Sequence, residues 1–218
     1  MTITSFVYAE VAPERTEHNF TRTYTGRMFW PLNPHAEDID VLDVAHHLSN
    51  ECRFNGATYR HYSVAQHAVL VSHLAARIAL AQSRSRGRFD YAREIALWGL
   101  HHDDSEAYLR DMIRPIKKAP GLGDVYKVIE RRMMVAVIER FDLTPHEPSI
   151  VKIADEIIGD SEGRDLVRGY IVKPNAETLP ETIVPLRPED AEAAYLRRHY
   201  ALINARSAAQ IAKELDAC

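Results

Sequence analysis

Residues 97–111 of the chain read LWGLHHDDSEAYLRD. The segment starts like a buried helix, with Leu97, Trp98 and Leu100, and then presents two histidines, two aspartates and a glutamate over the next six residues. A solvated helix face does not usually begin so abruptly after an apolar run. The abrupt change predicts that this helical segment places metal-ligating or catalytic side chains in the interior of a helical bundle.

Composition narrows the class of protein. With 218 residues and 46% hydrophobic content, the chain can form one domain, or at most two small ones, with an ordinary core. The net charge of −4 argues against a nucleic-acid partner. The two cysteines, Cys52 and Cys218, are too far apart in sequence to suggest a disulfide framework and suit a reducing, cytoplasmic location. The start lacks the pattern of a signal peptide, and we expect no membrane-spanning segment.

The spacing of apolar residues and the positions of proline and glycine predict an all-α fold, a bundle of five to seven helices. Prolines and aromatic residues in residues 1–38 indicate an irregular N-terminal arm with one short hairpin at Thr21–Trp30, and residues 39–218 form the helical domain. Ser63 and Gln66 have the spacing of a capping box at the start of a long helix. Helices are expected from about Ile39, over Ser63–Ala81, Tyr91–Tyr108, Gly123–Phe141, Ser149–Val172 and Glu189–Leu215.

Polar residues on apolar helix strips are the candidates for chemistry. His67 falls in register with Val71, Leu74 and Ile78, so it points into the bundle. A hydrogen-bonded core histidine would show the same pattern, and this residue alone does not distinguish the two.

The opening segment offers a second inward group. His102 follows Trp98 by four residues, and Glu106 follows His102 by four and Asp103 by three, so these three side chains can converge. His101 shares a strip with apolar residues too, and periodicity does not choose between the two histidines. The alternative is a solvated helix end with the carboxylates exposed.

A third helix repeats the pattern. Asp155 borders the apolar strip of Val151, Ala154 and Ile158, whereas Asp160 lies further round and is expected in solvent. A carboxylate beside a core is costly unless it is paired or bound to a metal. Three helices therefore supply His67, His102, Asp103 and Asp155, a donor set suited to one divalent transition metal ion, such as Co, Mn, Zn, Fe or Ni.

The spacing of these residues resembles the H…HD…D signature of the HD-domain metal-dependent phosphohydrolases over roughly residues 40–170. The flanking segments Tyr62–His67, His102–Lys117 and Lys152–Glu156 resemble the small nucleotidase branch of that family, which contains 5′-deoxynucleotidases and phage-type dATP triphosphohydrolases. The resemblance selects His102, not His101, as the metal ligand. It implies a nucleotide substrate and an HD-domain bundle.

The resemblance also implies roles for individual residues. Glu106 would act as general base, and Asp111 would contact a substrate hydroxyl or donate a proton. Arg53 and Lys117 would offset phosphate charge. Phe54 stands where this branch often has tryptophan against the sugar, so strict deoxyribose selectivity does not follow.

Three functions stay open at this point. Cleavage of deoxynucleoside monophosphates to nucleoside and phosphate leads, and release of triphosphate from deoxynucleoside triphosphates is nearly balanced with it. A non-catalytic, metal-stabilised nucleotide-binding module is the third, although such a module would not need Glu106. A cyclic-dinucleotide phosphodiesterase would carry ligands for a second metal, such as a G-Y-P element, which the sequence lacks. The amphipathic segment 189–215 could complete the monomer or form the face of a homo-oligomer.

Overall fold

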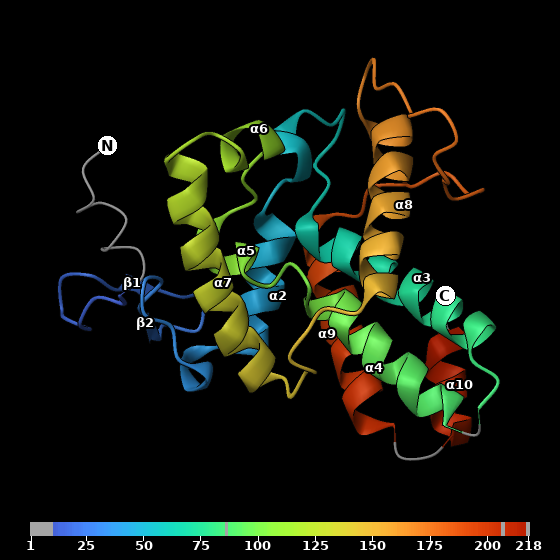
Figure 1. Ribbon diagram of the computed structural model, residues 1–218, viewed down its shortest axis with the longest axis horizontal. Coiled ribbons are helices and arrows are strands. Elements are labelled where there is room, and N and C mark those ends of the chain that lie inside the picture. Colours follow the sequence, from blue (N-terminus) through green and yellow to red (C-terminus); the bar gives the residue numbers. More distant parts are fainter. Residues whose placement is uncertain (1–10, 86, 206–207, 217–218) are drawn as a thin grey trace.

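The computed structural model describes residues 11–85, 87–205 and 208–216 and confirms an all-α bundle (Figure 1). In this part of the chain, six helices have ten residues or more, within the expected range of five to seven. They are α2 (Val41–Asn50), α3 (Val64–Gln82), α4 (Arg88–His101), α7 (Leu122–Arg140), α8 (Ser149–Leu166) and α9 (Pro188–Asn204).

Shorter elements connect the long helices and extend the two ends. Two strands, β1 and β2, form the expected hairpin in the arm, with Thr21 opposite Phe29 and Arg22 opposite Met28. Phe29 is fully buried in the same core cluster as Leu48 and Leu100, although the division of the chain at residue 38 stays a prediction. The short elements are β1 (Thr21–Arg22), β2 (Met28–Phe29), η1 (Ala36–Asp38), η2 (Arg53–Gly56), α5 (Glu106–Leu109), α6 (Arg114–Lys117) and α10 (Ala208–Asp216).

The expected helix over Tyr91–Tyr108 is wrong at its C-terminal end. Helix α4 ends at His101, and the chain turns before α5 begins at Glu106. The backbone N–H of Asp104 bonds to the carbonyl of His101, and that of Glu106 bonds to Asp103, both with the tighter three-residue spacing. The chain between α4 and α5 is therefore a tight turn over residues 102–105, which carries His102 and Asp103.

Two other boundaries differ from expectation. Helix α8 ends at Leu166 rather than near residue 172, because Val167 pairs with Thr58 and Gly169, at φ +77°, turns the chain back. The expected helix over Glu189–Leu215 is two helices, α9 and α10, and residues 206–207 between them lie outside the described residues.

Helix α3 runs through the middle of the bundle and contacts α2, α4, α8 and α9. Ser63 caps its N-terminus, as expected, by accepting a hydrogen bond from the backbone N–H of Gln66 at 3.2 Å. The other half of the expected capping box is wrong. The Gln66 side chain donates to the carbonyl of Val184 and accepts from the N–H of Leu186, both at 2.8 Å, and so ties the segment before α9 to the bundle.

Helix α3 is also, among the described residues, the one helix long and apolar enough to cross a membrane. Of its apolar stretch, 56% is buried inside the bundle, and the stretch is interrupted by His67 and Arg77. Burial to this extent is typical of a core helix.

A glycine sets the closest approach of the two helices that carry the histidines. A Cβ added at Gly99 of α4 would lie 3.0 Å from the Cα of Ser72 on α3. The Ser72 hydroxyl donates to the carbonyl of Ala96 at 2.7 Å across the same crossing. Because the neighbouring atoms belong to the backbone, the two helices would have to separate to admit a methyl group.

Replacing Gly99 with alanine is therefore expected to lower the free energy of unfolding by about 1–3 kcal/mol through overpacking. Urea denaturation of Gly99→Ala beside Gly159→Ala measures this effect. Nothing lies within 4 Å of a Cβ at Gly159, which also sits inside a helix, so that control should be neutral or stabilised by up to about 1 kcal/mol. Equal stability of the two variants would contradict the packing argument.

Candidate metal and catalytic site

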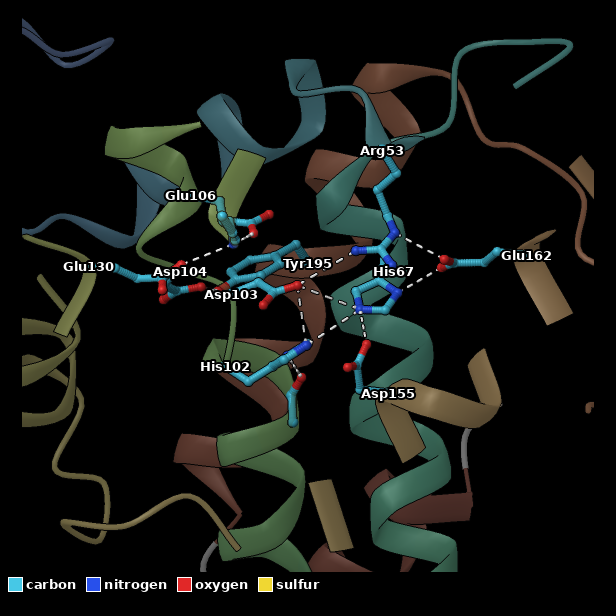
Figure 2. Close-up of polar contacts among 12 residues, drawn as sticks. Arg53, His67, His102, Asp103, Asp104, Glu106, Glu130, Asp155, Glu162 and Tyr195 are labelled. Atoms are coloured by element: carbon cyan, nitrogen blue, oxygen red, sulfur yellow. Dashed lines mark hydrogen bonds and ion pairs between the residues drawn. The ribbon is translucent and has the colours of Figure 1, made fainter. Parts of the chain in front are cut away.

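Three helices bring a group of ligand-type side chains to one point (Figure 2). His67 of α3, His102 at the end of α4 and Asp155 of α8 each offer an atom, and these atoms all lie within 4.8 Å of one another. The Nε2 atom of His67 lies 3.4 Å from the Nε2 of His102 and 3.2 Å from Oδ1 of Asp155. The three side chains that the sequence predicts to face inward therefore meet.

Asp103 joins this group from the turn after α4. Its Oδ2 atom lies 3.2 Å from the Nε2 of His102 and 3.6 Å from the Nε2 of His67. All four predicted ligands are thus close together, and their two imidazoles and two carboxylates form a donor set suited to a divalent transition metal.

The second nitrogen of each imidazole is already engaged. The Nδ1 atom of His67 lies 2.7 Å from Oε1 of Glu162, and the Nδ1 of His102 lies 2.9 Å from the carbonyl oxygen of Gly99. Both partners accept a hydrogen bond, which places a proton on Nδ1 and leaves the Nε2 lone pair of each ring facing the cluster. Metal-ligating histidines show this arrangement, with the outer acceptor fixing the tautomer and the ring orientation. The donor atoms therefore fit a metal.

Glu162 is a residue of the site that the sequence reasoning missed. It is fully buried, and its carboxylate accepts hydrogen bonds from Tyr62 at 2.7 Å and from Nε of Arg53 at 2.9 Å as well as from His67. Burial raises the pKa of Glu162, but the charges of Arg53 and His67 and the hydrogen bonds outweigh it and lower the pKa below its ordinary value. Its position seven residues after Asp155, about two helical turns along the same face of α8, is the signal that could have found it.

Electrostatics keep the carboxylates of the cluster ionised. Burial raises the pKa of Asp155, yet its hydrogen bond with His67 and the charges of both histidines lower it to about 2. The pKa of Asp103 falls as well, because His102, His67 and Arg53 outweigh its burial. Burial lowers the pKa of His102, but Asp103 and Asp155 raise it to about 10. The negative charge of the cluster thus attracts a cation, and a metal must compete there with protons on the imidazoles.

Glu106 lies next to the cluster without belonging to it. Its side chain is 6% exposed, and its Oε1 accepts a hydrogen bond from Nζ of Lys117 at 3.2 Å. Its Oε2 is buried and has no hydrogen-bond partner among the described residues. Burial, followed by the charges of Asp103 and Asp111, raises the pKa of Glu106 well above its ordinary value. A carboxylate with one free oxygen and a raised pKa suits proton transfer.

The remaining predicted residues line one cavity of about 480 Å³ beside the cluster. Burial raises the pKa of Asp111, and the charge of Asp103 adds to the effect, so this carboxyl group holds a proton more readily than an ordinary aspartate. The cavity is lined by Arg53, Phe54, Asp103, Glu106, Asp111, Met112, Ile113, Arg114, Lys117, Asp155, Glu156, Gly159, Asp160, Tyr170 and Lys173.

Arg53 and Phe54 reach the cavity from η2. The Nη1 atom of Arg53 lies 3.6 Å from Oδ2 of Asp103, and its Nε bonds Glu162, so Arg53 lies between a predicted ligand and the carboxylate that holds His67. Phe54 and Asn55 have positive φ values of 54° and 52°, and Gly56 one of 75°, so the chain turns tightly here. This tight turn holds the phenyl ring beside the guanidinium.

The structure places His101 away from the cluster, in a second buried network. Its Nδ1 bonds Asp104 at 2.6 Å, and its Nε2 lies 3.0 Å from Nδ1 of His199 on α9. The hydroxyl of Tyr195 donates to Asp104 at 2.5 Å. The alternative of a solvated helix end is therefore wrong, because Asp104 is fully buried and Glu106 nearly so.

The second network predicts a pH dependence of stability. Burial, with the charges of His101 and Arg140, lowers the pKa of His199 to about 3. Between that value and an unfolded pKa near 6.5, the unfolded chain binds a proton that the folded chain does not, so stability falls as the pH drops below about 6.5. In the His199→Asn variant, the free energy of unfolding should fall less steeply with decreasing pH, by up to about 1.4 kcal/mol per pH unit. Urea titrations at pH 6.5 and 5 test this, and parallel losses in both proteins would contradict it.

Asp160 is a further correction. It was expected in solvent, yet it is buried and accepts a hydrogen bond from the Tyr170 hydroxyl at 2.7 Å. A Cβ added at Gly163 would lie 2.4 Å from the Tyr170 ring, so this glycine lets the ring lie flat against α8. The turn after α8 thereby becomes a wall of the cavity, and it also contributes Lys173.

A helical bundle that brings an H…HD…D set to one point, beside an acidic residue in a cavity, defines the HD-domain class. The family described as 5′-deoxynucleotidase YfbR-like matches residues 52–158. The chain is 34% identical over 196 residues to the uncharacterized protein YfdR of Escherichia coli, an alignment that covers 88% of this chain and 99% of that protein. It is also 34% identical over 203 residues to an uncharacterized protein of Rhodobacter capsulatus, covering 85% of this chain and 96% of that one.

The chain therefore belongs to the YfbR-like family. This is a family of HD-domain phosphohydrolases that depend on divalent metals. The resemblance seen in the sequence is confirmed at the level of the family.

Proposed function

We propose that this protein is a divalent-metal-dependent phosphohydrolase that cleaves the 5′-phosphate ester of deoxynucleoside monophosphates to nucleoside and phosphate. One observation carries the proposal. Four ligand-type side chains converge beside a cavity large enough for a nucleotide. Glu106, whose buried Oε2 has no hydrogen-bond partner among the described residues, lines that cavity together with Asp103 and Asp155.

His67, His102, Asp103 and Asp155 would hold the ion. A bound divalent ion would polarise a phosphoryl oxygen and lower the pKa of a water molecule, and which of Co, Mn, Zn, Fe or Ni is used stays a prediction. As the carboxylate, Glu106 would accept the proton of the attacking water on its free Oε2. Water attacks phosphorus, and the bond from phosphorus to the 5′ oxygen breaks.

The other cavity residues orient the nucleotide. Arg53 offers a guanidinium next to the cluster and would offset charge on the phosphate. Asp111, with its raised pKa, would protonate the leaving 5′ oxygen or contact a sugar hydroxyl. Phe54 would pack against the sugar. The sequence predicts that Lys117, which also lines the cavity, contacts phosphate.

A second candidate activity has support from the cavity wall. Arg114 and Lys173 add positive charge beyond Arg53, which would suit a longer phosphate chain. Release of triphosphate from deoxynucleoside triphosphates is therefore the alternative, and a non-catalytic binding module is disfavoured by the free, buried oxygen of Glu106.

Location and assembly are part of the proposal. We expect a cytoplasmic enzyme without nucleic-acid or membrane partners. Tyr195 and Leu202 of α9 are fully buried within the monomer, whereas Ile203 is exposed, so a homo-oligomer that used this helix would pack against its outer face.

Product analysis by chromatography tests the proposal. Metal-stripped protein is resupplied with Co, Mn or Zn and given ribo- and deoxyribonucleoside mono- and triphosphates, with Asp103→Ala as control. Nucleoside plus orthophosphate from deoxynucleoside monophosphates supports the leading activity. Nucleoside plus triphosphate supports the alternative. Absence of any metal-dependent product would overturn both and leave a binding module.

A further inference from the structure

The Lys117 ammonium group lies between two carboxylates from different helices. Its Nζ atom is 3.2 Å from Oε1 of Glu106 on α5 and 3.0 Å from Oε1 of Glu130 on α7. The side chains of Lys117 and Glu130 are 25% and 27% exposed, so both are largely shielded from water. In Figure 2, Glu106 and Glu130 lie on the side of the cluster opposite Glu162.

Contacts with α7 hold both the backbone and the side chain of Lys117 in place. A Cβ added at Gly123 would lie 2.1 Å from the carbonyl oxygen of Lys117, so α6 and the start of α7 are in direct backbone contact. The Tyr126 ring centroid lies 5.5 Å from Nζ, close enough for a cation–π contact. Burial lowers the pKa of Lys117, but Glu106 and Glu130 raise it above its ordinary value, so the group stays charged.

These contacts differ from those expected of a lysine that binds phosphate, whose donors would be free for the substrate. An ammonium group has three donors, and two of those on Lys117 already point at carboxylates. The same contact fixes Oε1 of Glu106 and leaves Oε2 without a partner among the described residues. The position of Lys117 therefore decides which oxygen of Glu106 is available.

We infer that Lys117 and Glu130 are positioning residues for Glu106. Lys117 fixes one oxygen of the carboxylate so that the other accepts the proton, and Glu130 holds Lys117 in place from α7. The inference rests on the proposed role of Glu106 as general base. It assigns a function to Glu130, which no sequence motif singled out, and replaces phosphate contact as the main function of Lys117.

Steady-state kinetics of the full-length, metal-loaded protein separate the two functions of Lys117. If it positions Glu106, Glu130→Gln and Lys117→Met should lower kcat by about 10- to 100-fold, the cost of a misplaced catalytic group, with KM within about twofold. The double variant should be no slower than Lys117→Met alone, because both changes act through one contact. Glu139→Gln, an exposed glutamate on the same helix, should behave as wild type.

Two further measurements guard against loss of folding. Each variant should unfold in one cooperative thermal transition, at a lower Tm where the shielded ion pair is broken, and should hold as much metal as wild type. A crystal structure of Lys117→Met should show the Glu106 carboxylate rotated, with His67 and His102 unmoved, and this readout does not depend on activity.

Opposite results would overturn the inference. A raised KM with unchanged kcat in Lys117→Met, and wild-type kinetics in Glu130→Gln, would return Lys117 to phosphate binding. An unmoved Glu106 in the crystal structure would have the same meaning. If wild-type protein hydrolyses no nucleotide, the proposed function itself fails, whereas an active wild type with an unaffected Glu130→Gln defeats only the inference.

Discussion

Asp103→Ala should lose both metal and activity. Asp103 contacts both histidines of the cluster and also faces Arg53, so alanine removes a predicted ligand and leaves the guanidinium beside two imidazoles with less negative charge. Loss of an outer partner of a metal ligand already costs about 10- to 100-fold in affinity or activity, and loss of a ligand should exceed the upper value. Elemental analysis after gel filtration, together with kcat/KM at saturating metal, measures both effects.

The control for this variant is Asp90→Ala, which removes an exposed aspartate at the other end of α4. It should keep its metal and its activity. Stoichiometric metal and wild-type turnover in Asp103→Ala would remove Asp103 from the ligand set and leave His67, His102 and Asp155 as a three-residue site.

Glu106→Gln should keep its metal and lose turnover. The amide has nearly the same shape as the carboxylate and can still accept from Lys117 through its oxygen, but it cannot take a proton from water. A positioned general base contributes about 10²- to 10⁴-fold, so kcat should fall by that amount with little change in KM. Single-turnover kinetics with metal-saturated protein give the rate of the chemical step directly.

The contrast between these two variants is itself informative. Metal loss in Asp103→Ala with metal retention in Glu106→Gln assigns the two acids to different functions, although they are only three residues apart. A Glu106→Gln protein with normal kcat would mean that another group accepts the proton. The free oxygen of Glu106 would then be only an unsatisfied buried atom.

The parts of the site that follow helical periodicity could be predicted from the sequence. The strips that aim His67 and Asp155 inward are local properties of α3 and α8, and the distances between the side chains agree with them. The choice between His101 and His102 was different. Both are inward-facing, and only the resemblance separated them, because the turn after His101 is not visible in the periodicity of the apolar residues.

The parts of the site that depend on contacts between distant segments could not be predicted. Glu162 lies 95 residues from His67, and Glu130 reaches Lys117 from another helix. The local sequence around a carboxylate does not show whether it is buried and paired with a histidine or exposed to solvent. For the same reason Asp160 was expected in water, since its partner Tyr170 lies beyond a turn that was taken to be helix.

The predicted metal ligands and the cavity wall lie on different kinds of element, and this affects how the fold can change its specificity. The predicted ligands lie on, or at the end of, helices of fourteen or more residues, whereas much of the cavity wall comes from η2, α6 and the turn after α8. Such short surface segments tolerate insertions and substitutions far better than packed helices do. Substitutions at a few loop positions could therefore change the molecule that the cavity accepts, while the crossing at Gly99 keeps the predicted metal ligands in place.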